Sequence, residues 1–470
     1  MEKYRIEKDF LGEVKVPINA YWGAQTQRAI ENFPISGIRF PDVFIRSIAY
    51  IKLACAKVNS ELDILDKNIS DAIIQSCSEI IEGRFSDQFP LDIFQTGSGT
   101  STNMNVNEVI ATRANEILKG HKDSKYPVHP NDHVNKGQST NDVIPSAIHI
   151  SAHILIKESL IISLRLLRKK IEERSSDFKS IVKTGRTHLM DAMPLTIKQE
   201  MSGWATQIEL SIERIQDILS RLSELAIGGT AVGTGFTTHP EFGKRVSRVL
   251  SEMTNIKFRE SRNHFQAQST MDTVTELSGH LKTLATSLLK IANDIRWMNS
   301  GPIAGLSEIT IPSIQPGSSI MPGKVNPVIL EAIRMACVQV IGNDTVISIS
   351  NLMGEFQLNV MLPVIAHNII QSITILSNGA NLMAKKVIDG LDVNEKHISE
   401  LTERNPMIAT ALNPIIGYDK TAEVIKKALK EKRTMKEIVV EMGYLSKKEV
   451  DKILDPKKMT SPGFPPTKKS

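Results

Sequence analysis

The segment from Gln315 to Pro327, here called the serine loop, holds the residue types best suited to chemistry. Two adjacent serines, a lysine and an asparagine stand between glycines and prolines, which predict a mobile loop. Hydroxyls beside a cation and an amide are typical of a loop that presents reacting groups from a rigid scaffold. Its polar residues are Ser318, Ser319, Lys324 and Asn326, and Glu331 follows on the next expected helix.

Two further polar loops run directly into expected helices. Thr96–Asn105 is dense in hydroxyls and amides, and His129–Asp142 has the same character before a second helix. Because a helix N-terminus offers free N–H donors, both loops are candidate anion-binding sites. For any single residue in them, a helix cap or a solvated turn is the competing interpretation.

The fourth polar segment, Lys183–Ala192, contains a lone histidine, His188, and a lone histidine is more often structural than catalytic.

Elsewhere, the spacing of Gly317 and Gly323 resembles a nucleotide-binding P-loop. That interpretation is excluded because five residues separate the two glycines and because valine, where a P-loop has serine or threonine, follows the lysine.

The histidines and cysteines form no credible metal site. His129 and His133, with Asp132, lie on a loop interrupted by proline, where this spacing gives poor ligand geometry. The three cysteines are far apart and fit neither a disulfide framework nor a ligand set. We therefore expect no metal and no cofactor.

Long amphipathic helices must position these loops. Apolar residues recur every three or four positions from Ile197 to Leu225 and from Met271 to Ile295. Further helices are expected from Asn141 to about Arg174, after Pro327, and from Val360 to Ile388. Short connections make such helices antiparallel neighbours, so we expect a five-helix bundle. Apolar residues outside the main stripes predict that this bundle is also buried against other subunits.

The length and composition predict a soluble protein of two or three domains, because a chain of 470 residues is longer than one that folds around a single hydrophobic core. We expect an N-terminal domain at 1–138, the bundle at 139–395 and a small helical domain at 396–470, with a disordered tail from Pro456. A net charge of +5 without a long basic run outside the tail argues against a nucleic-acid partner. The charged N-terminus and the absence of an uninterrupted 18-residue apolar run predict a cytoplasmic protein with no membrane partner.

The polar loops carry a family resemblance. Gly317–Pro327, which reads GSSIMPGKVNP, resembles the signature of the fumarase/aspartase superfamily, and the resemblance covers nearly the whole chain. Thr96–Thr100, Gly185–Leu189 and Gly228–Gly235 are similar to the class II fumarases, the iron-independent type. Aspartases typically have glutamine where this chain has His188.

The resemblance implies an all-α homotetramer with three domains per subunit, whose five-helix bundles combine into a twenty-helix core. It implies the reversible trans hydration of fumarate, a small dicarboxylate, to L-malate through an aci-carboxylate carbanion. Two alternatives stay open: ammonia elimination from aspartate, and a non-catalytic helical structural protein. The presence of Ser318, Lys324, Asn326 and His188 together argues against the second alternative.

The resemblance also implies roles for individual residues. Ser318 is the base, Lys324 and Asn326 hold the aci-carboxylate, and His188 with its partner Glu331 protonates the departing hydroxide. Segments from three different subunits meet in each active site, one with Thr100, one with His188 and one with Ser318. The substrate carboxylates are oriented by Ser98, Thr100, Ser139, Thr140, Asn141, Thr187 and Ser319, and a second carboxylate site is formed by His129, Asn131 and Asp132. Thr140 stands where many fumarases have serine, which keeps the hydroxyl.

Overall fold

The computed structural model describes residues 4–463. Its described strands occur only in short two-stranded pairs among many helices, so the all-α expectation is confirmed. The chain divides into two compact units. Unit 1 comprises Met1–Ile162, Glu213–Ala285 and Cys337–Ser377, and unit 2 comprises Ser163–Ile212, Thr286–Ala336 and Asn378–Ser470. The division into three domains at 138/139 and 395/396 remains a prediction.

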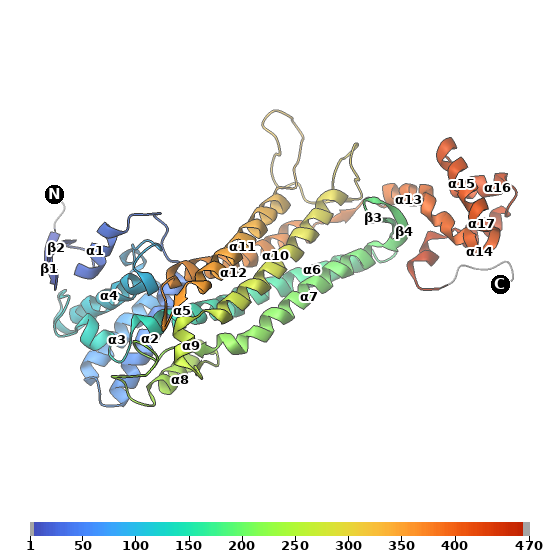
Figure 1. The fold of residues 1–470 in the computed structure, drawn as a ribbon. Coiled ribbons are helices and arrows are strands. Elements are labelled where there is room, and N and C mark those ends of the chain that lie inside the picture. The colour runs from blue at the N-terminus through green and yellow to red at the C-terminus, as the bar shows by residue number, and fades with distance from the viewer. Residues whose placement is uncertain (1–3, 464–470) are drawn as a thin grey trace. The chain divides into compact units, whose positions relative to one another are not determined.

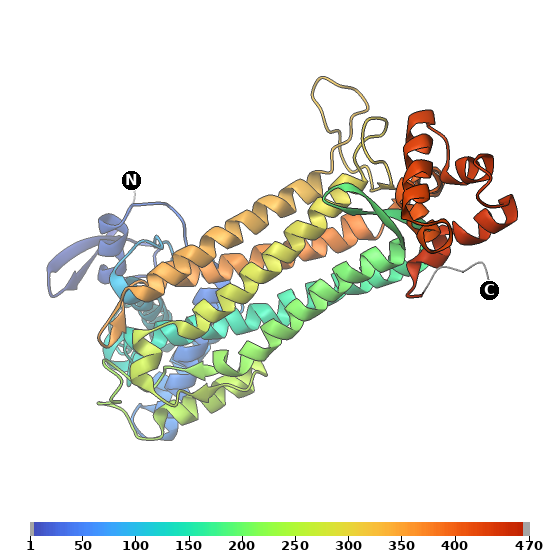
Figure 2. The same ribbon diagram turned by 45° about the vertical axis from the view of Figure 1, so that its right-hand side comes forward.

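The long helices expected from the apolar periodicity are all present, and each has residues in both units. Within each unit their segments run side by side (Figures 1 and 2). The positions that predicted them are the buried ones, as for Ile208, Ile212 and Ile215. They are α5 (Thr140–Leu155) continued by α6 (Ile161–Asp177), α7 (Ile197–Leu222), α10 (Asp272–Met298), α11 (Val328–Leu352) and α12 (Leu362–Met383), with π-helical turns η4 (Ile156–Leu160) and η5 (Ala384–Ile388).

Unit 1 also holds the N-terminal hairpin and most of the shorter helices. In it, α2 packs against α3, α5 and α8 and forms an aliphatic core with them (Figure 1). The helical elements are α1 (Ala24–Asn32), α2 (Asp42–Glu61), α3 (Lys67–Ile81), η1 (Ser86–Gln88), η2 (Gly97–Gly99), α4 (Thr100–Lys119), η3 (Pro130–Val134), α8 (Phe242–Thr254) and α9 (His264–Ser269). The strand pairs are β1 (Tyr4–Asp9) with β2 (Gly12–Pro17), β5 (Glu224–Leu225) with β6 (Arg259–Glu260), and β8 (Gly354–Glu355) with β9 (Leu358–Asn359).

Unit 2 holds the hairpin of β3 (Val182–Thr187) and β4 (Met190–Thr196), with α13 (Glu395–Arg404) against β3. Figure 2 shows this green hairpin beside the red C-terminal helices. The short pair β7 (Ile309–Thr310) and β10 (Asp392–Val393) lies in the same unit. The remaining elements, η6 (Pro406–Leu412), α14 (Asn413–Ile416), α15 (Tyr418–Glu431), α16 (Met435–Glu441) and α17 (Lys447–Ile453), enclose a separate aliphatic core.

The predicted disorder of the tail is wrong for its first residues. Pro456–Thr460 forms a 3-10 turn, η7, that packs on β4. The Asp455 carboxylate accepts from Lys457 N at 3.0 Å, and Gln199 Nε2 donates to Thr460 O at 2.7 Å. A capping aspartate followed by proline therefore orders this stretch. Residues 464–470 lie outside the described part of the chain.

Two helical stretches are long and apolar enough to span a membrane by length and composition alone, Thr140–Asp177 and Val328–Leu352. Neither stretch contains 18 consecutive apolar residues, but the mean hydropathy of an 18-residue window is 1.4 in the first and 1.2 in the second. The most apolar window is 61% buried in the first stretch and 33% buried in the second. Buried core helices of soluble proteins meet the same criterion. The second value shows that α11 exposes much of its apolar surface within a single chain.

Candidate active site

Ser318 lies at a turn of the serine loop where its hydroxyl meets two backbone donors. The Oγ atom accepts hydrogen bonds from Ile320 N at 3.2 Å and from Met321 N at 3.0 Å. Ser318 is half-buried, whereas Ser319 and Lys324 are exposed. N–H groups that donate to an oxygen stabilise its deprotonated form, so this turn favours a serine that gives up its proton.

Asn326 holds the two ends of the serine loop together. Its Nδ2 donates to Gly317 O at 2.7 Å, and Gly317 N donates to Lys324 O at 2.8 Å. A Cβ atom at Gly317 would lie 2.5 Å from Asn326 N, so this close approach requires glycine. The amide of Asn326 thus shapes the loop and keeps its Oδ1 and one N–H for a ligand.

His188 lies at the tip of the β3–β4 hairpin. Thr187 pairs with Met190, which leaves His188 and Leu189 as a two-residue turn with φ values of 56° and 61°. Turns of this kind require positive φ at both positions and favour Asn-Gly. Strained residues that a structure retains cluster at functional sites, and the His188 and Thr187 side chains are exposed here.

Ser98 and Thr100 lie together where α4 begins. Ser98 is buried in the left-handed region with φ 63°, and Ser98 N donates to Val360 O at 2.9 Å. Its Oγ lies 3.4 Å from Thr100 Oγ1. The positive end of a helix favours an anion, so these hydroxyls stand where a substrate carboxylate could bind.

Ser139 and Thr140 open α5, and both hydroxyls already accept a hydrogen bond. Ser139 Oγ accepts from Asn141 N at 3.2 Å, and Thr140 Oγ1 accepts from Asn103 Nδ2 at 3.0 Å. Each hydroxyl can still donate its own proton to a carboxylate. The helix cap and the ligand role predicted for Ser139 are therefore compatible.

Asp142 is a residue of this region that sequence reasoning missed. Its buried carboxylate accepts from Ser139 N at 2.9 Å, Gly228 N at 3.1 Å and Thr230 N at 2.9 Å. Burial raises the pKa of Asp142 to about 6, against the lowering effect of those donors. Asn141 Nδ2 donates to Ala231 O at 2.8 Å, so both side chains hold the 228–235 turn. The Ser-x-x-Asp spacing of a capping box could have identified Asp142.

Asn131 and Asp132 lie in the π-helical turn η3, which His129 caps at its N-terminus. His129 Nδ1 accepts from the backbone N of Asn131 and of Asp132, each at 3.3 Å. His129 and Asn131 line a cavity of about 420 Å³ that Lys8 and Lys125 also line. The carboxylates of Asp9 and Glu108 also line this cavity, so its lining carries both signs of charge and does not by itself select an anion.

The predicted site residues fall into two groups in the chain. Unit 1 contains Ser98, Thr100, His129, Asn131, Asp132, Ser139, Thr140 and Asn141, and unit 2 contains Thr187, His188, Ser318, Ser319, Lys324, Asn326 and Glu331. Within residues 4–463, no hydrogen bond or ion pair is made by the side chains of His188, Lys324 or Glu331. In the same range, no cluster of three or more His, Cys, Asp or Glu is placed to hold a metal ion.

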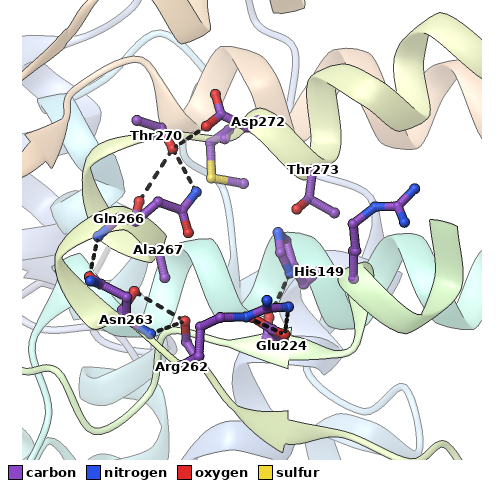
Figure 3. Close-up of a pocket in the computed structure, with 12 residues that line it drawn as sticks. His149, Glu224, Arg262, Asn263, Gln266, Ala267, Thr270, Asp272 and Thr273 are labelled. Atoms are coloured by element: carbon purple, nitrogen blue, oxygen red, sulfur yellow. Dashed lines mark hydrogen bonds and ion pairs between the residues drawn. The ribbon is translucent and has the colours of Figure 1, made fainter.

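Another cavity in unit 1, of about 390 Å³, contains none of the predicted residues (Figure 3). It lies where α9 and the start of α10 meet His149 of α5. Its arginines are already paired, Arg221 Nε with Glu276 at 2.9 Å and Arg262 Nη2 with Glu224 at 2.6 Å. A dianionic ligand would have to displace both pairs, so we do not take this cavity as the active site.

Comparisons with known proteins account for nearly the whole chain. A family model described as lyase matches residues 12–342, and one described as fumarase C C-terminus matches 408–461. The class II fumarate hydratase of Xylella fastidiosa strain Temecula1 is 52% identical over 463 residues, which cover 98% of this chain and 97% of that protein. The class II fumarate hydratase of Thermus thermophilus is 48% identical, over 98% of this chain and 99% of that protein.

Solved structures agree with these matches. The crystal structure of recombinant class II fumarase from Schistosoma mansoni superposes with a TM-score of 0.94 at 37% identity, covering 97% of this chain and 99% of that one. The fumarate lyase:delta crystallin from Brucella melitensis in native form gives 0.90 at 38% identity, covering 96% and 100%.

Proposed function

Because the chain belongs to the lyase family of the class II fumarate hydratases, we propose that it catalyses the reversible trans hydration of fumarate to L-malate. The observation that carries this proposal is the 52% identity, over 98% of the chain, to a protein named for that activity. The fold and the geometry of the serine loop support it independently.

The reaction must remove a proton from the carbon beside a carboxylate of an already dianionic substrate. Ser318 would take this proton, because the N–H groups of Ile320 and Met321 stabilise the deprotonated hydroxyl. The resulting aci-carboxylate would be held by Lys324 and by the remaining Asn326 amide hydrogen. Electrostatic stabilisation of this intermediate is the largest task of the site.

On the opposite face, hydroxide leaves together with a proton. We assign this proton to His188, directly or through a water, since an imidazole can both accept and donate a proton. Glu331 would orient His188. Neither side chain has a hydrogen-bonding partner among the described residues of one chain, so we place their partners in other subunits. The two carboxylates would be oriented by Ser98, Thr100, Ser139, Thr140, Asn141, Thr187 and Ser319.

A homotetramer with shared active sites is part of the proposal. The apolar surface of α11 supports it, because Met335 is 72% exposed, Val338 61% and Leu352 78% in the single chain. Such a surface on a long helix is typical of one that packs against other subunits. A cytoplasmic location is also proposed, supported by three cysteines that are free and buried. His129, Asn131 and Asp132 would form the second carboxylate site.

Malate should yield fumarate, and aspartate should yield none. The test offers each compound separately to the purified protein and follows the absorbance of the conjugated double bond of fumarate. Fumarate from aspartate alone would replace this proposal with ammonia elimination. No product from either compound would favour the structural protein that lacks catalysis.

Gly317→Ala should lower kcat/KM about 100-fold, because the added methyl forces the serine loop open by about 1 Å around Asn326. The control is Gly203→Ala on α7, where a Cβ meets nothing within 4 Å. Both variants are measured with malate at a temperature where each is folded. Equal activity of the two variants would show that the close approach at Gly317 does not matter for turnover.

A further inference from the structure

A cluster of buried charges lies at the base of the β3–β4 hairpin. Lys183 Nζ is 2.6 Å from Glu200 Oε2 and 3.0 Å from Glu308 Oε2, and Arg186 Nη2 is 2.8 Å from Glu308 Oε1. The side chains of Lys183 and Glu308 are only 2% and 1% exposed. Each oxygen of one buried carboxylate is thus paired with a different cation of the hairpin.

The hairpin sequence makes this double pairing possible. In a regular strand Lys183 and Arg186 would point to opposite faces, because side chains alternate. The register shifts between Thr184 and Arg186, at Gly185, where a Cβ atom would lie 2.5 Å from Met193 O. A bulge of this kind re-aims a side chain, and here it brings both cations to Glu308.

Glu308 itself stands at the start of the segment that leads to the serine loop. Its backbone N donates to Met298 O at 2.8 Å, and its O accepts from Asn394 N at 2.9 Å. Ile309 and Thr310 follow at once as β7, paired with β10. The carboxylate therefore joins the hairpin that carries His188 to the anchored base of the loop that carries Ser318.

We propose that Glu308 is a positioning residue whose carboxylate, through Lys183 and Arg186, fixes the His188 hairpin relative to the base of the serine loop in the same chain. The inference rests on the proposed function. A buried ion pair is weak evidence for stability, because desolvation offsets most of the attraction, but it defines one geometry for the groups that it joins. In the proposed tetramer the two loops of one chain serve two different active sites, so Glu308 positions one group in each.

The direct test replaces Glu308 by glutamine, which keeps the size but leaves one cation facing an amide N–H. We expect the kcat of Glu308→Gln to fall about 100-fold relative to the wild type, since a misplacement of about 1 Å can cost that much. Glu308→Asp, which keeps the charge, should recover kcat to within about tenfold of the wild type. Because activities are compared with the wild type, failure of the proposed function would appear in the wild type itself.

The matched control is Glu79→Gln. The Glu79 carboxylate is 9% exposed and takes two hydrogen bonds from Arg113, at 2.7 Å and 2.9 Å, in unit 1. Its loss should lower the melting temperature while kcat stays within about twofold of the wild type. If Glu308→Gln does not assemble, Lys183→Met removes the buried cation instead and should lower kcat about tenfold.

Mixed tetramers separate the two loops. In the first mixture, one chain carries both His188→Asn and Glu308→Gln and the other carries Ser318→Ala, so the Glu308→Gln chain supplies the intact serine loop to every restored site. In the second mixture, one chain carries both Ser318→Ala and Glu308→Gln and the other carries His188→Asn, so the Glu308→Gln chain supplies the intact His188 to every restored site. Both mixtures should recover at least tenfold less activity than the mixture without Glu308→Gln. The proposal is overturned if the kcat of assembled Glu308→Gln lies within twofold of the wild type. If Glu308→Gln does not assemble, the same criterion applies to assembled Lys183→Met. Full recovery of activity in both mixtures would also overturn it.

Discussion

Ser318→Ala should lower kcat for malate by about 10²–10⁴-fold, the range that a positioned general base contributes. Alanine removes the Oγ that accepts from Ile320 N and Met321 N, and no other described side chain replaces it there. A dicarboxylate inhibitor should bind Ser318→Ala nearly as well as the wild type, because the base acts on the transition state more than on the ground state. Steady-state kinetics and inhibitor titration measure the two quantities.

Ser319→Ala is the matched control for this substitution. Ser319 is adjacent and exposed, and no described backbone N–H donates to its hydroxyl. As a proposed carboxylate ligand it should raise KM more than it lowers kcat. Near-normal turnover of Ser318→Ala, or an equal loss of kcat in both variants, would remove Ser318 from the base role.

The long helices could be predicted because their signal is local. Apolar residues at three- and four-residue spacing become one buried stripe in any helix that packs on one side, as Ile208, Ile212 and Ile215 do. Their exact ends depend on distant residues. Helix α7 stops at Leu222 because Glu224 and Leu225 pair in parallel with Arg259 and Glu260.

The β3–β4 hairpin could not be predicted in the same way. Its turn residues are His188 and Leu189, neither of which belongs to the Asn-Gly or Asp-Gly signals of a two-residue turn. The strained turn is held by the rest of unit 2, for example by Asn405 Nδ2, which donates to Ala192 O at 2.8 Å. Contacts between residues 213 positions apart leave no trace in local sequence.

The candidate site was predicted from residue types and family resemblance, and the structure adds the groups that hold those residues. Nothing in the local sequence shows that the Ser318 hydroxyl accepts two N–H bonds or that Asn326 closes its own loop. Glu308 pairs with Arg186 across 122 residues and could not be found from spacing. The catalytic roles themselves remain proposals.

His188→Asn and Ser318→Ala chains, each nearly inactive alone, should recover activity when they are unfolded together and reassembled. In the proposed tetramer the histidine and the serine of one site come from different subunits. Random assortment of equal amounts then gives about a quarter of the sites one intact histidine and one intact serine, in a closed symmetric oligomer. Turnover of the mixture with malate should approach that fraction of the wild-type value.

The control mixes the two folded proteins without dissociation, and it should recover little activity because each closed tetramer keeps its own subunits. Mass measurement of the reassembled sample establishes that mixed tetramers are present. Mixed tetramers without recovered turnover would mean that His188 and Ser318 act from the same chain, because every chain in the mixture lacks one of the two groups, or that one of the two residues does not have the role assigned to it. Recovery near a quarter cannot arise within a single chain, so it would place the two groups of each active site on different subunits.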